Sequence, residues 1–407
     1  MNAPVLRVGI VGLGGATVSM LPSLMADGRI AVAGVADVHA PARERFAADF
    51  GVPAYDRAED LAADPGVDAV YIATPHAVHA EQAIAALSLG THVLVEKPLA
   101  LTVEDCLAVD AASRASGAQV VVGHTHAFDR PVRLMHEIIV SGRLGRVAMI
   151  NNWNFGAFLY RPRRPDELDT ARGGGIIFNQ VPHQVDVARL LGGGLVRSVR
   201  SSAFVLDPAR PTEGSHTTFL DFEDGAAAGL VFSGYDGFDS DELHGWVDEN
   251  GRRRGPAHGA ARRSLRALGS TPEVELKTGR GYGSGQATDP PPGPLHQPHF
   301  GVLVVSCEGG DLRATPEGVV LYDEAGATEF PVPCDGPFPD KSLVVDELYR
   351  AAALGEPSPH DAAWGAATVE VCRAILASAQ GRREVVLSHQ VAADRARRTF
   401  DVPTTIR

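Results

Sequence analysis

Residues 5–17 read VLRVGIVGLGGAT, and this stretch decides the fold that we expect. The apolar run over residues 5–11 has the length of a buried strand, and residues 17–26 have the pattern of a helix. Between them lie Gly12 and Gly14. In such a turn the first glycine permits the tight bend, and the second lets the backbone approach a pyrophosphate at the positive end of the helix. The stretch therefore predicts a dinucleotide-binding turn.

Two further positions bear on this turn. The third glycine of the usual pattern is replaced by Thr17, which we expect to loosen the packing of helix on strand, while Gly15 keeps the turn small. Asp37 ends the second predicted strand, 20 residues after Thr17. A carboxylate there can accept hydrogen bonds from the adenosine ribose and would repel a 2′-phosphate, which predicts NAD rather than NADP. The alternative is an ordinary surface aspartate in a turn.

The pattern of strands and helices predicts two domains. Strands and helices alternate over residues 1–125, which favours an α/β fold with a doubly wound parallel sheet, a Rossmann domain. Residues 126–407 begin and end with predicted helices, and between these helices lie successive strands, which predicts an α+β domain with a large open antiparallel sheet for substrate binding and oligomerisation. Because an open sheet has a face to be covered, we expect a homodimer or homotetramer.

The segment 250–298 departs from both patterns. It contains nine glycines and seven prolines, follows an acidic block and contains a basic one. One interpretation is a solvated, mobile insertion between strands, as is usual for long loops. The other is a flap over the active site or onto a neighbouring subunit.

Composition limits the partners. Lys and Arg number 37 against 50 Asp and Glu, a net charge of −13, which argues against nucleic acid and anionic membranes. The four cysteines are widely spaced and form neither a CxxC pair nor a disulfide framework. We find no signal-peptide pattern and no apolar run long enough to cross a bilayer. These features predict a cytoplasmic protein with a small-molecule substrate.

Three motifs occur in a recognisable order. Thr74-Pro75-His76 is followed by His79, then comes Glu96-Lys97-Pro98, and finally Gly173-Gly174-Gly175 with Asn179 and His183. With these motifs the chain resembles the glucose–fructose oxidoreductase / inositol dehydrogenase (Gfo/Idh/MocA) family over nearly its whole length except 250–298. The resemblance implies NAD(P)-dependent hydride transfer, commonly at a secondary alcohol.

The resemblance also implies roles for single residues. Lys97 is then the catalytic lysine, with a cis peptide before Pro98, and His183 contacts the reacting hydroxyl. Asn179 stands where many members carry aspartate, and it can position a hydroxyl but cannot take its proton. The base is therefore Lys97 or His183, since both can reach a suitable pKa. The remaining cofactor-binding residues implied are Thr74, Pro75, His79, Glu96 and Lys97 itself, with Glu96 on the nicotinamide side.

Arginines gather before the glycine triplet. Arg161, Arg163 and Arg164 lie in one short loop, and arginine forks bind carboxylates in a bidentate manner. We expect them to bind an anionic substrate together with His124; the alternative is pairing with Asp166, Glu167 and Asp169. His124 and His126 could start a metal site, but no third ligand is placed by spacing, so we expect no metal.

Segments 159–169, 178–186 and 298–308 resemble the phthalate cis-dihydrodiol dehydrogenase branch of the family. That resemblance implies a carboxylated cis-dihydrodiol, such as phthalate 4,5-dihydrodiol, as the substrate. Two alternatives stay open: a sugar or inositol dehydrogenase, and a catalytically inactive dinucleotide-binding regulator of the same fold.

Overall fold

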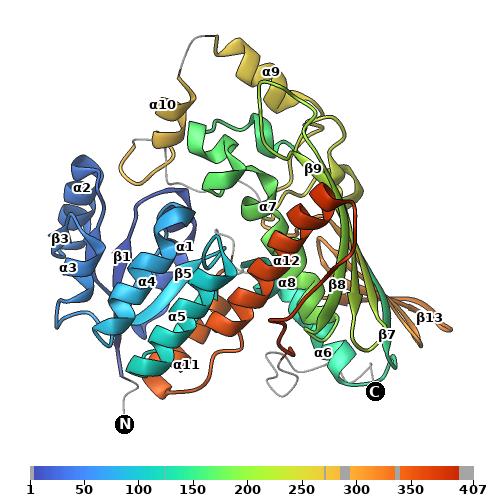
Figure 1. The fold of residues 1–407 in the computed structure, drawn as a ribbon, viewed down its shortest axis with the longest axis horizontal. Coiled ribbons are helices and arrows are strands. Elements are labelled where there is room, and N and C mark those ends of the chain that lie inside the picture. The colour runs from blue at the N-terminus through green and yellow to red at the C-terminus, as the bar shows by residue number, and fades with distance from the viewer. Residues whose placement is uncertain (1–3, 124, 270–271, 285–293, 335–339, 394–407) are drawn as a thin grey trace. The chain divides into compact units, whose positions relative to one another are not determined.

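The computed structural model describes residues 4–123, 125–269, 272–284, 294–334 and 340–393 (Figure 1). The chain forms two compact units, one of residues 1–124, 272–289 and 340–369, the other of residues 125–271, 290–339 and 370–407. We expected one continuous second domain from residue 126. Two later segments instead join the first unit, because their apolar side chains pack there: Ala362, Ala366 and Val369 belong to its core.

The first unit contains a six-stranded parallel sheet in the order β3-β2-β1-β4-β5-β6. Its strands are β1 (Leu6–Val11), β2 (Ile30–Ala36), β3 (Ala54–Tyr55), β4 (Ala69–Ile72), β5 (His92–Glu96) and β6 (Val120–Gly123). Its helices include α1 (Gly15–Ala26), α2 (Ala40–Phe50), α3 (Ala58–Ala62), α4 (His79–Ser88), α5 (Val103–Ser116), α10 (Glu273–Thr278) and α11 (Ser342–Leu354). This is the predicted Rossmann arrangement. Strand order reverses between β1 and β4, where such sheets bind ligands.

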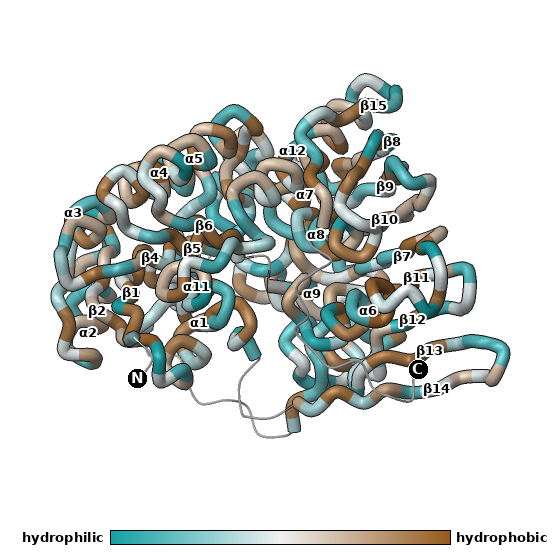
Figure 2. Tube along the Cα trace, turned by 90° about the horizontal axis from the view of Figure 1, so that it is seen from below, coloured by the Kyte–Doolittle hydropathy of each residue, from teal (hydrophilic) through white to brown (hydrophobic). Residues whose placement is uncertain are grey.

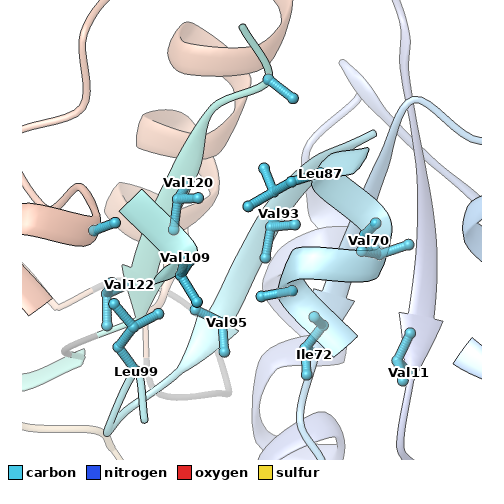
Figure 3. Packing of buried hydrophobic residues seen from close by; sticks show 14 of the residues in the cluster. Val11, Val70, Ile72, Leu87, Val93, Val95, Leu99, Val109, Val120 and Val122 are labelled. Carbon is cyan, nitrogen blue, oxygen red and sulfur yellow. The ribbon is translucent and has the colours of Figure 1, made fainter. Parts of the chain in front are cut away.

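The core of this unit is formed by strands that are covered on both faces. Such strands are mostly apolar, as Figure 2 shows for β4 and for the middle of β5, which begins with His92 and ends with Glu96. Val70, Val93 and Val95 are fully buried or nearly so, and Leu87 and Val109 come from the covering helices α4 and α5 (Figure 3). This rigid core fixes the carboxyl ends of the strands.

The second unit contains a nine-stranded sheet in the order β14-β13-β12-β11-β7-β10-β9-β8-β15. The strands are β7 (Val147–Phe155), β8 (Val196–Phe204), β9 (Ser215–Phe222), β10 (Ala227–Ser233), β11 (Val302–Cys307), β12 (Gly310–Thr315), β13 (Gly318–Asp323), β14 (Gly326–Pro331) and β15 (Val385–Val386). Every pairing is antiparallel except that of β7 with β10. The sheet is therefore mixed, not purely antiparallel as expected, because the chain returns to β10 after passing through two helices and two strands.

Helices cover one face of this sheet. α6 (Arg130–Val140) packs against β12 and β13, and α8 (Val181–Leu191) packs against β7 and β10. α8 follows the short helix α7 (Gly175–Asn179), and the two are separated at Gln180, whose φ of −114° departs from helical geometry. α12 (Ala362–Gly381) belongs to the first unit as far as Val369 and to the second beyond it.

The described part of 250–298 in the second unit is folded, which corrects the interpretation of a mobile insertion there. Arg254 forms ion pairs with Asp239 and Asp241, both buried, and Asp236 accepts a hydrogen bond from the backbone N–H of Arg262 at 2.7 Å. α9 (Ala260–Ala267) follows. The acidic and basic blocks therefore neutralise each other instead of facing solvent separately.

Candidate active site

The glycine turn lies at the carboxyl end of β1. Gly12 has a φ of +90°, and a Cβ there would stand 2.8 Å from the carbonyl oxygen of Ala73. Only glycine satisfies both conditions. At Gly14 and Gly15 a Cβ would meet no atom within 4 Å, so this side of the turn is open. No side chain caps the amino end of α1, which leaves its N–H groups available to an anion.

Thr17 braces the turn. Its side chain is fully buried, and its hydroxyl donates a hydrogen bond of 2.6 Å to the carbonyl oxygen of Gly12. We expected a residue larger than glycine to loosen this packing. The hydroxyl instead stabilises the bend, because the buried polar atom finds a partner in the turn itself.

Asp37 also shapes the turn. Its Oδ2 accepts the N–H of Leu13 at 2.6 Å, and its Oδ1 accepts the N–H of His39 at 2.7 Å. Each carboxylate oxygen can accept a further hydrogen bond, so Asp37 can bind ribose hydroxyls while it keeps these two backbone hydrogen bonds. The open space at Gly14, the uncapped helix and this carboxylate fit a nicotinamide dinucleotide.

The loops after β4 and β5 are tied together by His79. Its imidazole is fully buried, with Nδ1 2.9 Å from the carbonyl oxygen of Pro98 and Nε2 2.9 Å from that of Thr74. Burial lowers its pKa, despite the two carbonyl partners, so the ring is neutral at pH 7. Because no part of it reaches the surface, His79 positions the two loops rather than touching a ligand directly. The hydroxyl of Thr74 donates to Gln82 at 2.6 Å, and Pro75 is exposed.

The Glu96-Lys97-Pro98 motif has the expected cis peptide between Lys97 and Pro98. Glu96 accepts a hydrogen bond from the hydroxyl of Tyr71 at 2.7 Å. The pKa of Tyr71 lies well above its usual value, first because the phenol is buried and then because Glu96 is close. Lys97 is half-buried. The motif therefore holds a carboxylate and an ammonium at the end of β5, the edge that also carries the glycine turn.

In the second unit, His183 lies in an aromatic cluster. Its ring is 8% exposed, and its centroid is 4.6 Å from that of His126 and 4.9 Å from that of Phe300. Nδ1 of His126 lies 2.7 Å from Oδ2 of Asp129. Asp129 and Phe300 were not predicted as site residues, although the spacing of His126 and Asp129 just before α6 was a usable signal. His124 lies outside the described residues.

A buried polar network attaches α8 to the sheet. The Gln184 amide donates to Oδ1 of Asn152 and, at 3.0 Å, to the carbonyl oxygen of Val231. Nε2 of His216 lies 3.2 Å from Oε1 of Gln184. Burial lowers the pKa of His216 to about 3, so this histidine is neutral. A satisfied network of this kind fixes the helix that carries His183.

Asn179 stabilises the glycine triplet. Its Nδ2 donates to the carbonyl oxygens of Gly173 at 3.1 Å and Gly175 at 2.7 Å. A Cβ on Gly174 would stand 2.6 Å from the backbone of Glu167, so the triplet packs directly on the arginine loop. Because the helix is interrupted at Gln180, Asn179 and His183 lie on two separate helices, α7 and α8, and not on one continuous helix.

The three predicted substrate arginines differ in their partners. Arg161 forms an ion pair with Glu249 (Nη1 to Oε1, 2.6 Å) and is 40% exposed at its side chain. Arg163 is buried, donates to the carbonyl oxygen of Phe158 at 3.1 and 2.8 Å, and lies 3.7 Å above that ring. Arg164 pairs with Asp166 at 3.4 Å. The alternative of internal pairing thus holds for Arg163 and Arg164, with Glu167 as a shared partner.

The pair of Arg161 and Glu249 is electrostatically strong. Burial raises the pKa of Glu249, but the adjacent Arg161 outweighs it and lowers the pKa to about 2. The guanidinium has further N–H donors besides the one that Glu249 accepts. Glu249 therefore holds Arg161 in place, and 40% of the arginine side chain remains exposed.

The described residues offer neither a metal centre nor a membrane-spanning helix. Within those ranges, no group of three or more His, Cys, Asp or Glu side chains is placed to hold a metal ion. Among the same residues, no helix is long and apolar enough to cross a membrane.

The fold and the site define a dinucleotide-binding oxidoreductase. Residues 6–124 match the model of the oxidoreductase family with an NAD-binding Rossmann fold, and residues 132–244 match the GFO/IDH/MocA C-terminal domain. The chain belongs to the Gfo/Idh/MocA family, and it is an NAD-binding dehydrogenase.

Known relatives agree with this assignment. The chain is 40% identical over 379 residues to 1-carboxy-3-chloro-3,4-dihydroxycyclohexa-1,5-diene dehydrogenase of Comamonas testosteroni, covering 91% of this chain and 94% of that protein. It is 32% identical over 223 residues to inositol 2-dehydrogenase 2 of Saccharopolyspora erythraea, covering 54% and 63%. A solved structure assigned as a dehydrogenase from Bordetella bronchiseptica RB50 has 42% identity and a TM-score of 0.89, covering 94% and 100%.

Proposed function

We propose that the protein oxidises a carboxylated cis-dihydrodiol with NAD, forming a dihydroxylated aromatic acid. The observation that carries the proposal is the 40% identity, over nearly the full length, to a dehydrogenase whose substrate is a carboxylated dihydroxycyclohexadiene. Arg161 supports the same substrate class, because Glu249 orients its guanidinium and 40% of the side chain is exposed. An arginine fork recognises a carboxylate in a bidentate manner.

In this proposal the site residues have separate roles. The nicotinamide, when bound, accepts the hydride. Gly12, Gly14 and Gly15 leave space for the pyrophosphate, and Asp37 receives the ribose hydroxyls. Thr74, Pro75 and Glu96 line the cofactor, while His79 positions these loops. Arg161 binds the substrate carboxylate.

The hydroxyl proton must leave as the hydride does, and Lys97 or His183 takes it. His183 is the histidine that contacts the reacting hydroxyl, and the pair of His126 and Asp129 orients its ring through their edge contact. Asn179 acts by holding the glycine triplet, because its amide cannot accept a proton at neutral pH. Arg163 and Arg164 shape the loop that presents Arg161.

The test is a screen for NAD reduction with the full chain. Phthalate 4,5-cis-dihydrodiol and a benzoate cis-dihydrodiol are compared with myo-inositol and glucose at equal concentrations. We expect NADH formation with the carboxylated diols and little with the polyols. Higher turnover of inositol or glucose would favour a sugar or inositol dehydrogenase, and no NADH with any compound would favour a regulator.

We further propose a cytoplasmic homodimer or homotetramer. The sheet face opposite α6 and α8 exposes Met149, Trp153 and Phe219, with exposed fractions of 47%, 50% and 51%. Apolar side chains gathered on an open sheet favour a second copy as their cover. Trp153→Glu should reduce the mass measured by light scattering to that of a smaller species. An unchanged mass would argue against this face as the interface. The four cysteines, all among the described residues, form no disulfide, as is usual in the cytoplasm.

A further inference from the structure

Residues 272–284, which follow α9 in the sequence, belong to the first unit and contact its glycine turn. The backbone N–H of Tyr282 donates a hydrogen bond of 2.9 Å to the carbonyl oxygen of Leu13, the middle residue of the turn. The N–H of Leu13 is itself bound by Asp37. Leu13 is therefore held from two sides, by the carboxylate expected at the ribose and by a segment from far along the chain.

The side chain of Tyr282 anchors this segment on α2. Its ring centroid lies 4.9 Å from that of Phe46 and 6.1 Å from that of Phe50. Its hydroxyl donates to Oδ2 of Asp49 at 2.8 Å. Phe46 is fully buried, so the ring of Tyr282 extends the core of the unit. An aromatic contact combined with a hydrogen bond to a carboxylate is a specific attachment, not a loose surface contact.

Two glycines beside Tyr282 permit the close approach. A Cβ on Gly281 would stand 3.0 Å from the carbonyl oxygen of Leu13. Gly283 has a φ of +75°, and a Cβ there would stand 3.3 Å from the side chain of Arg45. The sequence Gly281-Tyr282-Gly283 thus suits a segment that presses its backbone against the turn.

We propose that residues 272–284, which we name the turn clasp, form part of the dinucleotide site and retain the bound cofactor. The clasp connects the glycine turn to α2, the helix that begins just after Asp37. It thereby holds the turn in one conformation before the cofactor binds, which reduces the ordering cost of binding and slows release. This inference rests on NAD binding by the family fold and not on the proposed diol substrate.

The test measures NADH dissociation from the full chain by stopped-flow fluorescence. Tyr282→Ala removes the ring anchor and should raise the dissociation rate about tenfold, which corresponds to about 1.4 kcal/mol. Tyr282→Phe keeps the ring and the backbone contact, so its rate should stay close to that of the wild type. Tyr322→Ala, which removes an exposed tyrosine from β13, is the matched control and should leave the rate unchanged.

A second variant and a second measurement keep the proposal testable if Tyr282→Ala fails to fold. Gly281→Ala adds only a methyl group against Leu13 and should also accelerate NADH release. In the wild type, NADH should slow hydrogen exchange of the amides in 272–284. Unchanged dissociation in both Tyr282→Ala and Gly281→Ala would overturn the proposal, as would exchange in the clasp that is indifferent to NADH. Neither outcome depends on which alcohol is oxidised.

Discussion

The glycine turn and the arginine loop were both predicted from short sequence motifs, but the contacts that define their roles in the structure are of different kinds. At the turn, the backbone geometry requires glycine at Gly12, which has no room for a side chain, whereas Gly14 faces open space where the pyrophosphate is proposed to bind. In the loop, the three arginines are chemically alike, yet Arg163 is buried under backbone hydrogen bonds while Arg161 pairs with the distant Glu249. The role of a motif that acts through its backbone can be predicted from the motif alone. The role of a charged side chain depends on partners that the motif does not contain.

The largest effect is expected at Lys97, where a substitution should impair turnover and leave NADH binding at the glycine turn intact. Lys97→Met removes the candidate base or proton donor, so turnover should fall by about 10³-fold, within the range for general acid–base catalysis. NADH affinity, measured by fluorescence titration, should change little because the turn is intact. Lys341→Met is the control, since the hydrogen bond that joins Lys341 to Ser23 comes from its backbone. Full activity of Lys97→Met would remove this lysine from the mechanism.

The next effect distinguishes the two glycines. Gly14→Ala places a methyl group in open space, so the melting temperature should hold while NADH affinity falls about tenfold or more. Gly12→Ala adds a steric clash at positive φ, so it should lower both the affinity and the melting temperature. Calorimetry with and without NADH measures both quantities. If Gly14→Ala bound NADH with the affinity of the wild type, the pyrophosphate would not lie against this residue.

A moderate effect is expected in the folded insertion. Arg254→Ala removes the cation that Asp239 and Asp241 share, which should destabilise the protein by about 2–3 kcal/mol, less than for a fully buried pair because Arg254 is 32% exposed and Asp241 keeps His299 at 3.4 Å. Arg266→Ala, at an exposed position in the same basic block, should change stability by less than about 0.5 kcal/mol. Urea unfolding compares the two. Equal losses would mean that the ion pairs do not hold this segment.

The smallest effect is a pH dependence at Arg161. The folded-state pKa of Glu249 is about 2, below its ordinary value of 4.5, so the pair stabilises the fold above pH 4.5 and loses this contribution as the pH falls towards 2. In Arg161→Ala, burial raises the pKa of Glu249, and the carboxyl becomes protonated at a higher pH. The stability difference between wild type and variant should therefore shrink as the pH is lowered from 7 to about 4. A difference that stays constant would show that Glu249 is not coupled to Arg161.

Much of the first unit could be predicted because its signals are local. The strand before Gly12 and Asp37 after the second strand follow from short stretches of sequence, whereas the cis peptide at Pro98 is implied by the family resemblance. The bracing by Thr17 was missed, because a hydroxyl can compensate for a missing glycine only if a carbonyl lies in reach. The parallel pairing of β7 with β10 and the clasp at residues 272–284 depend on long-range contacts, which periodicity does not record.

The central claim is that a carboxylate is recognised by Arg161 in an NAD-linked diol dehydrogenase. The most direct measurement is kcat/KM for one cis-dihydrodiol with its carboxylate and for the same diol without it, in the wild type and in Arg161→Ala. The account predicts that the wild type prefers the carboxylated diol and that Arg161→Ala loses this preference, mainly through KM. An equal preference in both proteins, or none in the wild type, would contradict it.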